Sequence, residues 1–221
     1  MKKRITGVLA FLLVTAGLFA QAAHPPFWEE IQNFKKQDSL HFPAKNQILF
    51  VGSSSFRMWT DVQDAFPGYK ILNRGFGGSS LPDVIRYVND VIIPYQPKQI
   101  FIYCGDNDLA ASDTITPAIV LSRFKQLFYL VRNKLPKVPI AFVSIKPSPS
   151  RLRLMPKMDA ANKLIKEFLK GKSRTAFVDV YHKMLKADGK PMDDIFKEDK
   201  LHMTAKGYAI WQKAIKPYLL K

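Results

Sequence analysis

Short apolar runs alternate along this chain with longer segments in which apolar and polar positions are mixed. Five runs are almost continuously apolar, with none of the polar alternation of a sheet that faces water. Such runs are typical of strands buried on both faces of a parallel sheet. They are Gln47–Val51, Tyr69–Leu72, Gln99–Cys104, Val138–Ile145 and Thr175–Val180.

The segments between the runs have helical periodicity. Apolar residues recur every three or four positions in Pro117–Leu135 and again in Pro156–Lys170. Pro82 suits the first turn of a helix predicted over Leu81–Ile93, and Thr204 is a candidate cap for a last helix that ends near Leu219. Strand and helix in alternation predict an α/β fold, a doubly wound three-layer α/β/α sandwich. Its site is expected beyond the carboxyl ends of the strands.

The first residues predict a signal peptide. Lys2, Lys3 and Arg4 precede an apolar run from Val8 to Ala20, and Ala20-Gln21-Ala22 is a small-x-small cleavage site. The run is shorter than the roughly 20 residues of a membrane span. We therefore expect residues 1–22 to be removed and residues 23–221 to form a single domain. The exported protein would be periplasmic or extracellular, without a stable membrane anchor; an uncleaved anchor is the alternative.

Charge and cysteine content limit the possible partners. The formal net charge is +16, and removal of the three basic residues at the start leaves +13. For an exported protein this charge favours an anionic polysaccharide or a membrane surface over nucleic acid; lysines on solvated helix faces are the simpler interpretation. Cys104 is the only cysteine, so an intramolecular disulfide is excluded, and its place in an apolar run favours burial.

Polar, glycine-containing turns follow the first three apolar runs. They are Gly52-Ser53-Ser54-Ser55, the segment Asn73–Ser80, and Gly105–Asp108. Glycine in such a turn permits a positive φ or a close approach of the backbone to a ligand. Because parallel strands end at one edge of a sheet, the three turns are expected to lie together there.

Asp199 and His202 stand three residues apart near the end of the chain. At this spacing the carboxylate can bond one imidazole nitrogen and leave the other as a base, which a serine nucleophile requires. The alternatives are a helix N-terminal charge for Asp199 and a surface histidine for His202. His182 is interpreted as the start of a surface helix. No group of His, Asp and Glu has the spacing of metal ligands, so we expect no metal.

Four short motifs resemble, in the same order along the chain, the blocks of the SGNH (GDSL-like) hydrolases. They are Gly52-x-Ser54, Gly78, Gly105-x-Asn107-Asp108 and Asp199-x-x-His202. The resemblance extends from about Gln47 to Tyr208 and implies a flavodoxin-like sheet of about five parallel strands. It also implies ester hydrolysis without a metal or an organic cofactor. The segments GSSSFRMW, NRGFGGS and IKPSPSR further resemble a subgroup of this family that is found in exported bacterial proteins.

The resemblance assigns a role to each matching residue. Ser54 would be the nucleophile, His202 the general base and Asp199 the residue that orients it. The oxyanion would be bound by the N–H groups of Ser54 and Gly78 and by the side-chain amide of Asn107. Ser53 stands where the family usually has aspartate, Gly77-Gly78-Ser79-Ser80 where many relatives have Gly-Asp-Thr, and Lys200 where glycine often follows the aspartate. Ser55 is interpreted as a helix N-cap.

Substrate contacts are predicted from position alone. Lys146, Ser148 and Arg151 follow the fourth apolar run and are expected at the rim; a proline-stiffened, solvated loop is the alternative. Phe76 and Trp59 are candidates for stacking on sugar or acyl groups, and packing under the first helix is the alternative for Trp59. The predicted substrate is a small molecule or an acylated, above all an acetylated, polysaccharide.

Three alternatives to an acetylesterase remain. The first is a lipase, thioesterase or lysophospholipase-like hydrolase of longer acyl esters. The second is a carbohydrate-binding relative that has lost turnover, although retention of Ser54, Asp199 and His202 argues against it. A nucleotide-binding protein of flavodoxin type has little support, because no Gly-rich phosphate fingerprint follows the first apolar run.

Overall fold

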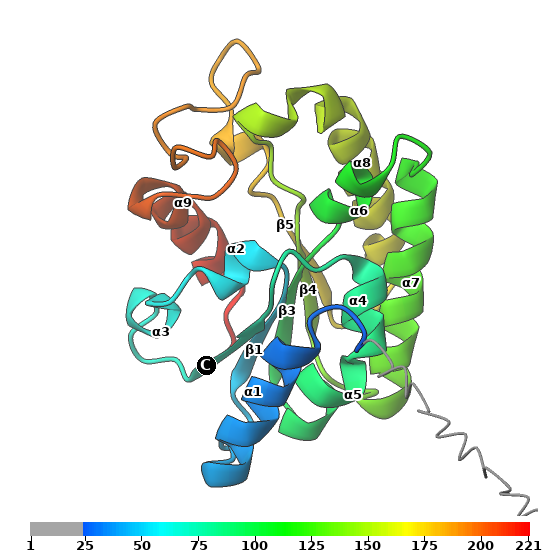
Figure 1. Ribbon diagram of the computed structural model, residues 1–221, viewed down its shortest axis with the longest axis vertical. Coiled ribbons are helices and arrows are strands. Elements are labelled where there is room, and N and C mark those ends of the chain that lie inside the picture. Colours follow the sequence, from blue (N-terminus) through cyan, green and yellow to red (C-terminus); the bar gives the residue numbers. More distant parts are fainter. Residues whose placement is uncertain (1–23) are drawn as a thin grey trace, which may run out of the picture.

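A sheet of five parallel strands forms the centre of the computed structural model, which describes residues 24–221 (Figure 1). The strand order is β2-β1-β3-β4-β5, the doubly wound order of flavodoxin-like folds. Each predicted apolar run overlaps one strand, so the predicted three-layer sandwich is confirmed. The strands are β1 (Ile48–Gly52), β2 (Ile71–Gly75), β3 (Gln99–Tyr103), β4 (Ile140–Val143) and β5 (Thr175–Val178). The predicted signal peptide lies outside the described residues.

Helices cover both faces of the sheet (Figure 1). One core packs against α1 (Trp28–Leu40), α4 (Leu81–Arg86), α5 (Val88–Val91), α7 (Pro117–Lys134) and α8 (Met155–Lys170). The other packs against α2 (Ser54–Arg57), α3 (Val62–Ala65) and α9 (Ala205–Ile215). The remaining helical elements are α6 (Asp106–Ala111), η1 (Ile93–Tyr95), η2 (Pro149–Leu154), η3 (His182–Met184) and η4 (Lys216–Tyr218).

The side-chain alternation of β1 shows how the sheet joins the two cores. Leu49 and Val51 contribute to the core under α7, whereas Ile48 and Phe50 contribute to the core under α9. Because both faces are covered, all five residues of β1 are buried. This is the physical reason for its continuous apolar run. Within residues 24–221, no helix combines the length and the apolar character that crossing a membrane requires.

Two predicted helices and one predicted cap differ from the structure. The helix predicted over Leu81–Ile93 is interrupted at Tyr87, which leaves the helical region (φ −101°, ψ 14°) between α4 and α5. The last helix ends at Ile215 rather than near Leu219, because Pro217 has no N–H to continue the α-helical ladder. Ser55 is not an N-cap: it lies inside α2, and Ser53 occupies the cap position.

Helix α1 was not predicted from the sequence, and a buried ion pair attaches it to the edge strand β2. Arg74 Nη2 lies 2.5 Å from Asp38 Oδ1, and the guanidinium sits between the rings of Phe34 and Tyr95, at 4.9 and 4.8 Å from their centroids. Burial and the hydrogen bond to Asp38 raise the pKa of Tyr95 to about 12, so its hydroxyl remains a donor. These contacts hold α1 beside the carboxyl end of β2.

Gly52 ends β1 in a conformation that only glycine adopts without strain. Its φ is +134°, and a Cβ at this position would lie 1.9 Å from the carbonyl oxygen of Tyr103 on β3. The chain therefore turns toward Ser54 in direct contact with the neighbouring strand.

We expect Gly52→Ala to lower the free energy of unfolding by on the order of 3 kcal/mol or more, from backbone strain and the clash with β3. Chemical denaturation would measure this. The matched control is Gly171→Ala, where φ is −83° and a Cβ would meet no atom within 4 Å. Equal stability of the two variants would contradict the account of Gly52.

Candidate active site

Three side chains from two distant segments of the sequence form a hydrogen-bonded chain at the carboxyl edge of the sheet. Ser54 Oγ lies 3.0 Å from His202 Nε2, and His202 Nδ1 lies 2.6 Å from Asp199 Oδ2. Ser54 begins α2 directly after β1, while the other two residues belong to the loop before α9. The structure thus brings together the serine, the histidine and the carboxylate that the sequence singled out.

The loop of Asp199 is built to hold its carboxylate in place. Asp199 Oδ1 accepts hydrogen bonds of 2.9 Å from the backbone N–H groups of Leu201 and His202. Desolvation acts to raise the pKa of Asp199, but the hydrogen bonds from His202 and Leu201 outweigh it and lower the pKa to about 2. Asp199 therefore stays ionised at neutral pH, and it orients the imidazole with Nε2 toward Ser54.

Asn107 and Gly78 lie beside Ser54, as expected for the turns that follow β3 and β2. Gly78 is exposed, and a Cβ built on it would lie 3.6 Å from Asn107 Nδ2. Asn107 Nδ2 donates to Ser53 Oγ at 2.8 Å and to the carbonyl of Ser79 at 3.2 Å. Ser53, at the family's aspartate position, thus accepts a hydrogen bond from Asn107.

A buried charged cluster lies behind Asn107. Arg151 Nη2 donates to Asn107 Oδ1 at 2.8 Å, and Arg151 Nη1 lies 3.2 Å from Asp106 Oδ2. Asp106 Oδ2 also accepts from the hydroxyl of Tyr103 and lies 3.8 Å from Lys146 Nζ. Because Arg151 has only donors, it fixes the amide of Asn107 with Oδ1 turned inward and Nδ2 turned toward Ser53.

The predicted substrate contacts are placed differently from expectation. Phe76 is fully buried and packs against the rings of Phe27 and Tyr87, so it is a core residue and does not face a substrate. Lys146 and Ser148 are also buried, because the segment after β4 packs inside the domain, where Lys146 Nζ lies 3.8 Å from Asp106 Oδ2. Arg151 is half-buried, and its guanidinium contacts Asn107 and Asp106.

Cys104 is buried as predicted, and Trp59 follows the packing alternative rather than the stacking role. Cys104 is fully buried, its thiol lies 3.3 Å from the carbonyl of Ser79, and burial raises its pKa well above the usual value. Trp59 is 2 % exposed and packs within the core that α9 covers. Neither residue contributes an exposed side chain to the site.

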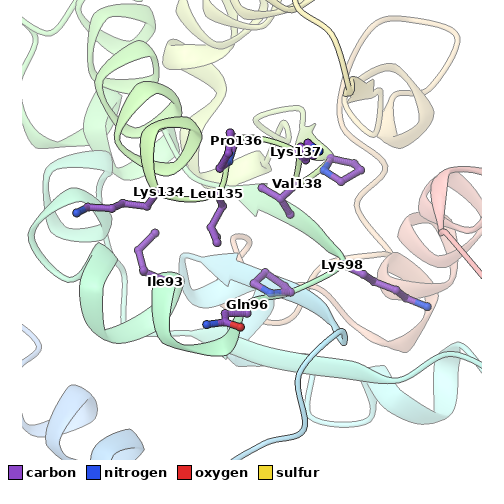
Figure 2. A pocket seen from close by; sticks show the side chains of 10 residues that line it. Ile93, Gln96, Lys98, Lys134, Leu135, Pro136, Lys137 and Val138 are labelled. Atoms are coloured by element: carbon purple, nitrogen blue, oxygen red, sulfur yellow. The ribbon is translucent and has the colours of Figure 1, made fainter.

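The structure also contains a cavity far from Ser54, at the amino ends of β3 and β4. This cavity of about 590 Å³ is lined by Lys98, Lys134, Lys137 and by residues that precede β3 and β4. Figure 2 shows these lining side chains. The cavity therefore lies at the opposite edge of the sheet from Ser54. In doubly wound sheets the reactive groups gather at the carboxyl edge, next to the switch point between β1 and β3. Ser54 and Asn107 flank that point.

Comparisons with known proteins agree with this geometry. The model of the GDSL-like lipase/acylhydrolase family matches residues 49–210, so the chain belongs to that family. Its members hydrolyse ester bonds, and the protein is therefore an esterase-type hydrolase. Among curated proteins none matches this chain.

Solved structures share the fold at low sequence identity. A Streptococcus pneumonia protein assigned as a platelet activating factor has 22 % identity and a TM-score of 0.76, covering 87 % of this chain and 92 % of its own. A GDSL-like lipase from Bacteroides thetaiotaomicron has 18 % identity and a TM-score of 0.69, covering 85 % and 96 %. An acetylxylan esterase from Geobacillus stearothermophilus has 14 % identity and a TM-score of 0.64, covering 80 % and 96 %.

Lys146 gives this site a pH-dependent stability. Burial lowers the pKa of Lys146 to about 8, with Asp106 acting in the opposite direction. The folded state thus loses this proton at a lower pH than the unfolded chain does. Between these two pKa values the unfolded state binds more protons, so the contribution of Lys146 to stability rises with pH.

We expect the wild type to gain about 2 kcal/mol of unfolding free energy relative to Lys146→Met between pH 7 and pH 9.5. Urea denaturation of both proteins at the two pH values measures this difference, and the comparison cancels other groups that titrate in this range. A difference that does not change with pH would show that Lys146 keeps an ordinary pKa.

Proposed function

We propose that this protein is an exported serine esterase that removes acyl groups, above all acetyl groups, from carbohydrate through an acyl-enzyme. The observation that carries the proposal is the chain of hydrogen bonds from Ser54 through His202 to Asp199. A serine hydroxyl is a weak nucleophile at neutral pH, and an adjacent imidazole oriented by a carboxylate supplies the base that it needs.

In the first step Ser54 Oγ attacks the ester carbonyl while His202 Nε2 takes the hydroxyl proton. Asp199, ionised and bonded to Nδ1, stabilises the imidazolium that forms. The carbonyl π electrons move to the oxygen, which becomes an oxyanion. When the C–O bond to the alcohol breaks, His202 returns its proton to the leaving alcohol, and the acyl group stays on Ser54.

We assign three donors to the oxyanion: the N–H groups of Ser54 and Gly78 and the side-chain amide of Asn107. Asn107 Nδ2 carries two N–H bonds. The shorter interaction, with Ser53 Oγ, holds the amide, while the longer one, with the carbonyl of Ser79, is exchanged for the oxyanion. In the second half of the reaction His202 takes a proton from water, which attacks the acyl carbon through the same oxyanion site. The bond from that carbon to Ser54 Oγ then breaks, the carboxylic acid leaves, and His202 returns the proton to Ser54.

The finer parts of the proposal have separate support. The basic and apolar start of the chain supports export. A similarity of fold to an acetylxylan esterase supports an acetylated carbohydrate substrate; the catalytic mutants of that protein replace a serine or a histidine by alanine. The proposed ester hydrolysis needs no cofactor, because protein groups supply the nucleophile, the base and the oxyanion donors.

Labelling with a fluorophosphonate probe tests the choice of nucleophile among three adjacent serines. We expect wild type to be labelled, and Ser54→Ala to lose labelling together with at least about 10⁴ of its kcat toward p-nitrophenyl acetate. The controls are Ser53→Ala and Ser55→Ala, which keep the nucleophile and should still be labelled. Labelling of folded Ser54→Ala at the wild-type rate would overturn the assignment.

Arg151 is expected to act through Asn107 rather than on the substrate. In Arg151→Met the carboxamide loses the donor that fixes its orientation, so we expect kcat for p-nitrophenyl acetate to fall about 10- to 100-fold with little change in KM. Partial recovery is expected in Arg151→Lys.

The matched control for this prediction is Arg153→Met, two residues away on η2, whose exposed side chain pairs only with the exposed Asp113. Its kinetics should equal those of wild type. A rise in KM with unchanged kcat in Arg151→Met would instead make Arg151 a substrate contact.

A further inference from the structure

A groove of about 560 Å³, lined mainly by residues with polar side chains, lies between α1 and α2 beside the carboxyl end of β2. One wall comes from α1, the other from Arg57 of α2 and from Thr60 just after it, and the floor comes from β2. The lining residues are Glu30, Asn33, Phe34, Gln37, Arg57, Thr60, Asn73 and Gly75.

The groove begins one helical turn from Ser54. Arg57, which lines it, follows Ser54 by three residues on α2, and helix positions at this spacing lie on the same face, roughly 5–6 Å apart. Gly75, also in the lining, pairs with Gly52 directly before the serine turn. A group bonded to the ester oxygen of a substrate at Ser54 can thus extend into the groove without a large gap.

Helix α1 also contacts the loop that carries Gly78. Glu30 Oε2 accepts a hydrogen bond of 2.9 Å from the N–H of Gly77, the residue before Gly78. Phe27, at the N-cap of α1, packs so closely that a Cβ on Gly77 would lie 2.2 Å from its ring. The same helix thus supports the oxyanion loop and forms one wall of the groove.

The chemistry of the lining indicates what it binds. Its only charges are the carboxylate of Glu30 and the guanidinium of Arg57, 3.9 Å apart, so they balance each other. Asn33, Gln37 and Thr60 add exposed amide and hydroxyl groups, which both donate and accept hydrogen bonds. A balanced set of donors and acceptors suits an uncharged ligand rich in hydroxyl groups better than a fatty chain or a phosphate.

Not every polar group of the lining is open to a ligand. Asn73 Nδ2 donates to the carbonyl of Phe56 at 2.7 Å, and Asn73 Oδ1 accepts from the N–H of Gly75 at 2.9 Å. Asn73 therefore stabilises the backbone at the base of the groove and has no free polar group for a ligand. Recognition falls to the exposed wall residues, of which Asn33 and Gln37 stand one turn apart on α1.

We propose that this groove is the subsite for the alcohol side of the ester, and that its occupant is an uncharged sugar ring. The inference rests on the proposed esterase activity of Ser54 and deepens it, because it names the part of the molecule that selects the substrate. Helix α1 precedes the region 49–210 that the family model matches, so one wall of the subsite comes from outside that region.

A double variant, Asn33→Ala with Gln37→Ala, tests the subsite by kinetics. Both side chains are exposed, so folding and melting temperature should be unchanged. Loss of two hydrogen bonds is expected to raise KM for an acetylated xylo-oligosaccharide about 10- to 30-fold. The kinetics on p-nitrophenyl acetate, whose leaving group is no sugar, should be unchanged. The control is Ser39→Ala, an exposed residue of α1 outside the groove lining.

Two kinetic outcomes would overturn the proposal. One is that the wild type hydrolyses the acetylated xylo-oligosaccharide and the double variant does so with the same KM. The other is a rise in KM for p-nitrophenyl octanoate without any change for the sugar, which would make the groove an acyl-chain site.

Direct binding separates this inference from the proposed reaction. Xylotetraose, cellotetraose and chitotriose, which carry no ester, are titrated calorimetrically into wild type and into the double variant. Binding of at least one by wild type, weakened about tenfold or more in the variant, supports the subsite even if no ester is hydrolysed. Failure of wild type to bind any of them overturns it, whatever the result with the serine-reactive probe.

Discussion

Parallel pairing of β1 between β2 and β3 is the constraint on which this molecule depends. Because these three strands run in one direction, the turns that follow them emerge at one edge, and these turns carry Ser54, Gly78 and Asn107. The pairing permits no side chain at Gly52, where β1 turns against the carbonyl of Tyr103. The loop before α9 completes the arrangement by placing His202 against a serine 148 positions earlier in the chain.

Much of this arrangement follows from the sequence, because buried parallel strands leave a clear apolar pattern. The spacing of Asp199 and His202 is less informative than it first looks. Asp179 and His182 have the same spacing after β5, and their side chains make the same contact at 2.8 Å. That histidine is 64 % exposed, whereas His202 is 21 % exposed and faces Ser54. Only the tertiary placement separates a surface pair from a candidate catalytic one.

The features that could not be predicted depend on polar contacts between distant segments. Asn73 and Arg74 are polar residues in a strand, and the apolar pattern therefore ended too early, at Leu72; their partners are backbone carbonyls of the α2–α3 region and Asp38 of α1. The position of Phe76 after a strand suggested a residue that stacks on a ligand. In the structure, Phe27 at the start of α1 packs against its ring and covers it. Arg151 and Asn107 are 44 positions apart, and nothing in the local sequence of either residue indicates their hydrogen bond.

The attachment of α1 through Arg74 and Asp38 separates two tasks within one small domain. The groups that carry out bond cleavage belong to turns fixed by the sheet, whereas the outer wall of the neighbouring groove belongs to a helix that rests on the edge strand. Substitutions on the exposed side of that helix change the side chains that line the groove, and they leave the geometry around Ser54 unchanged. With the groove as the proposed subsite, substrate preference is open to change at exposed positions of α1, while the reacting groups stay fixed by the sheet.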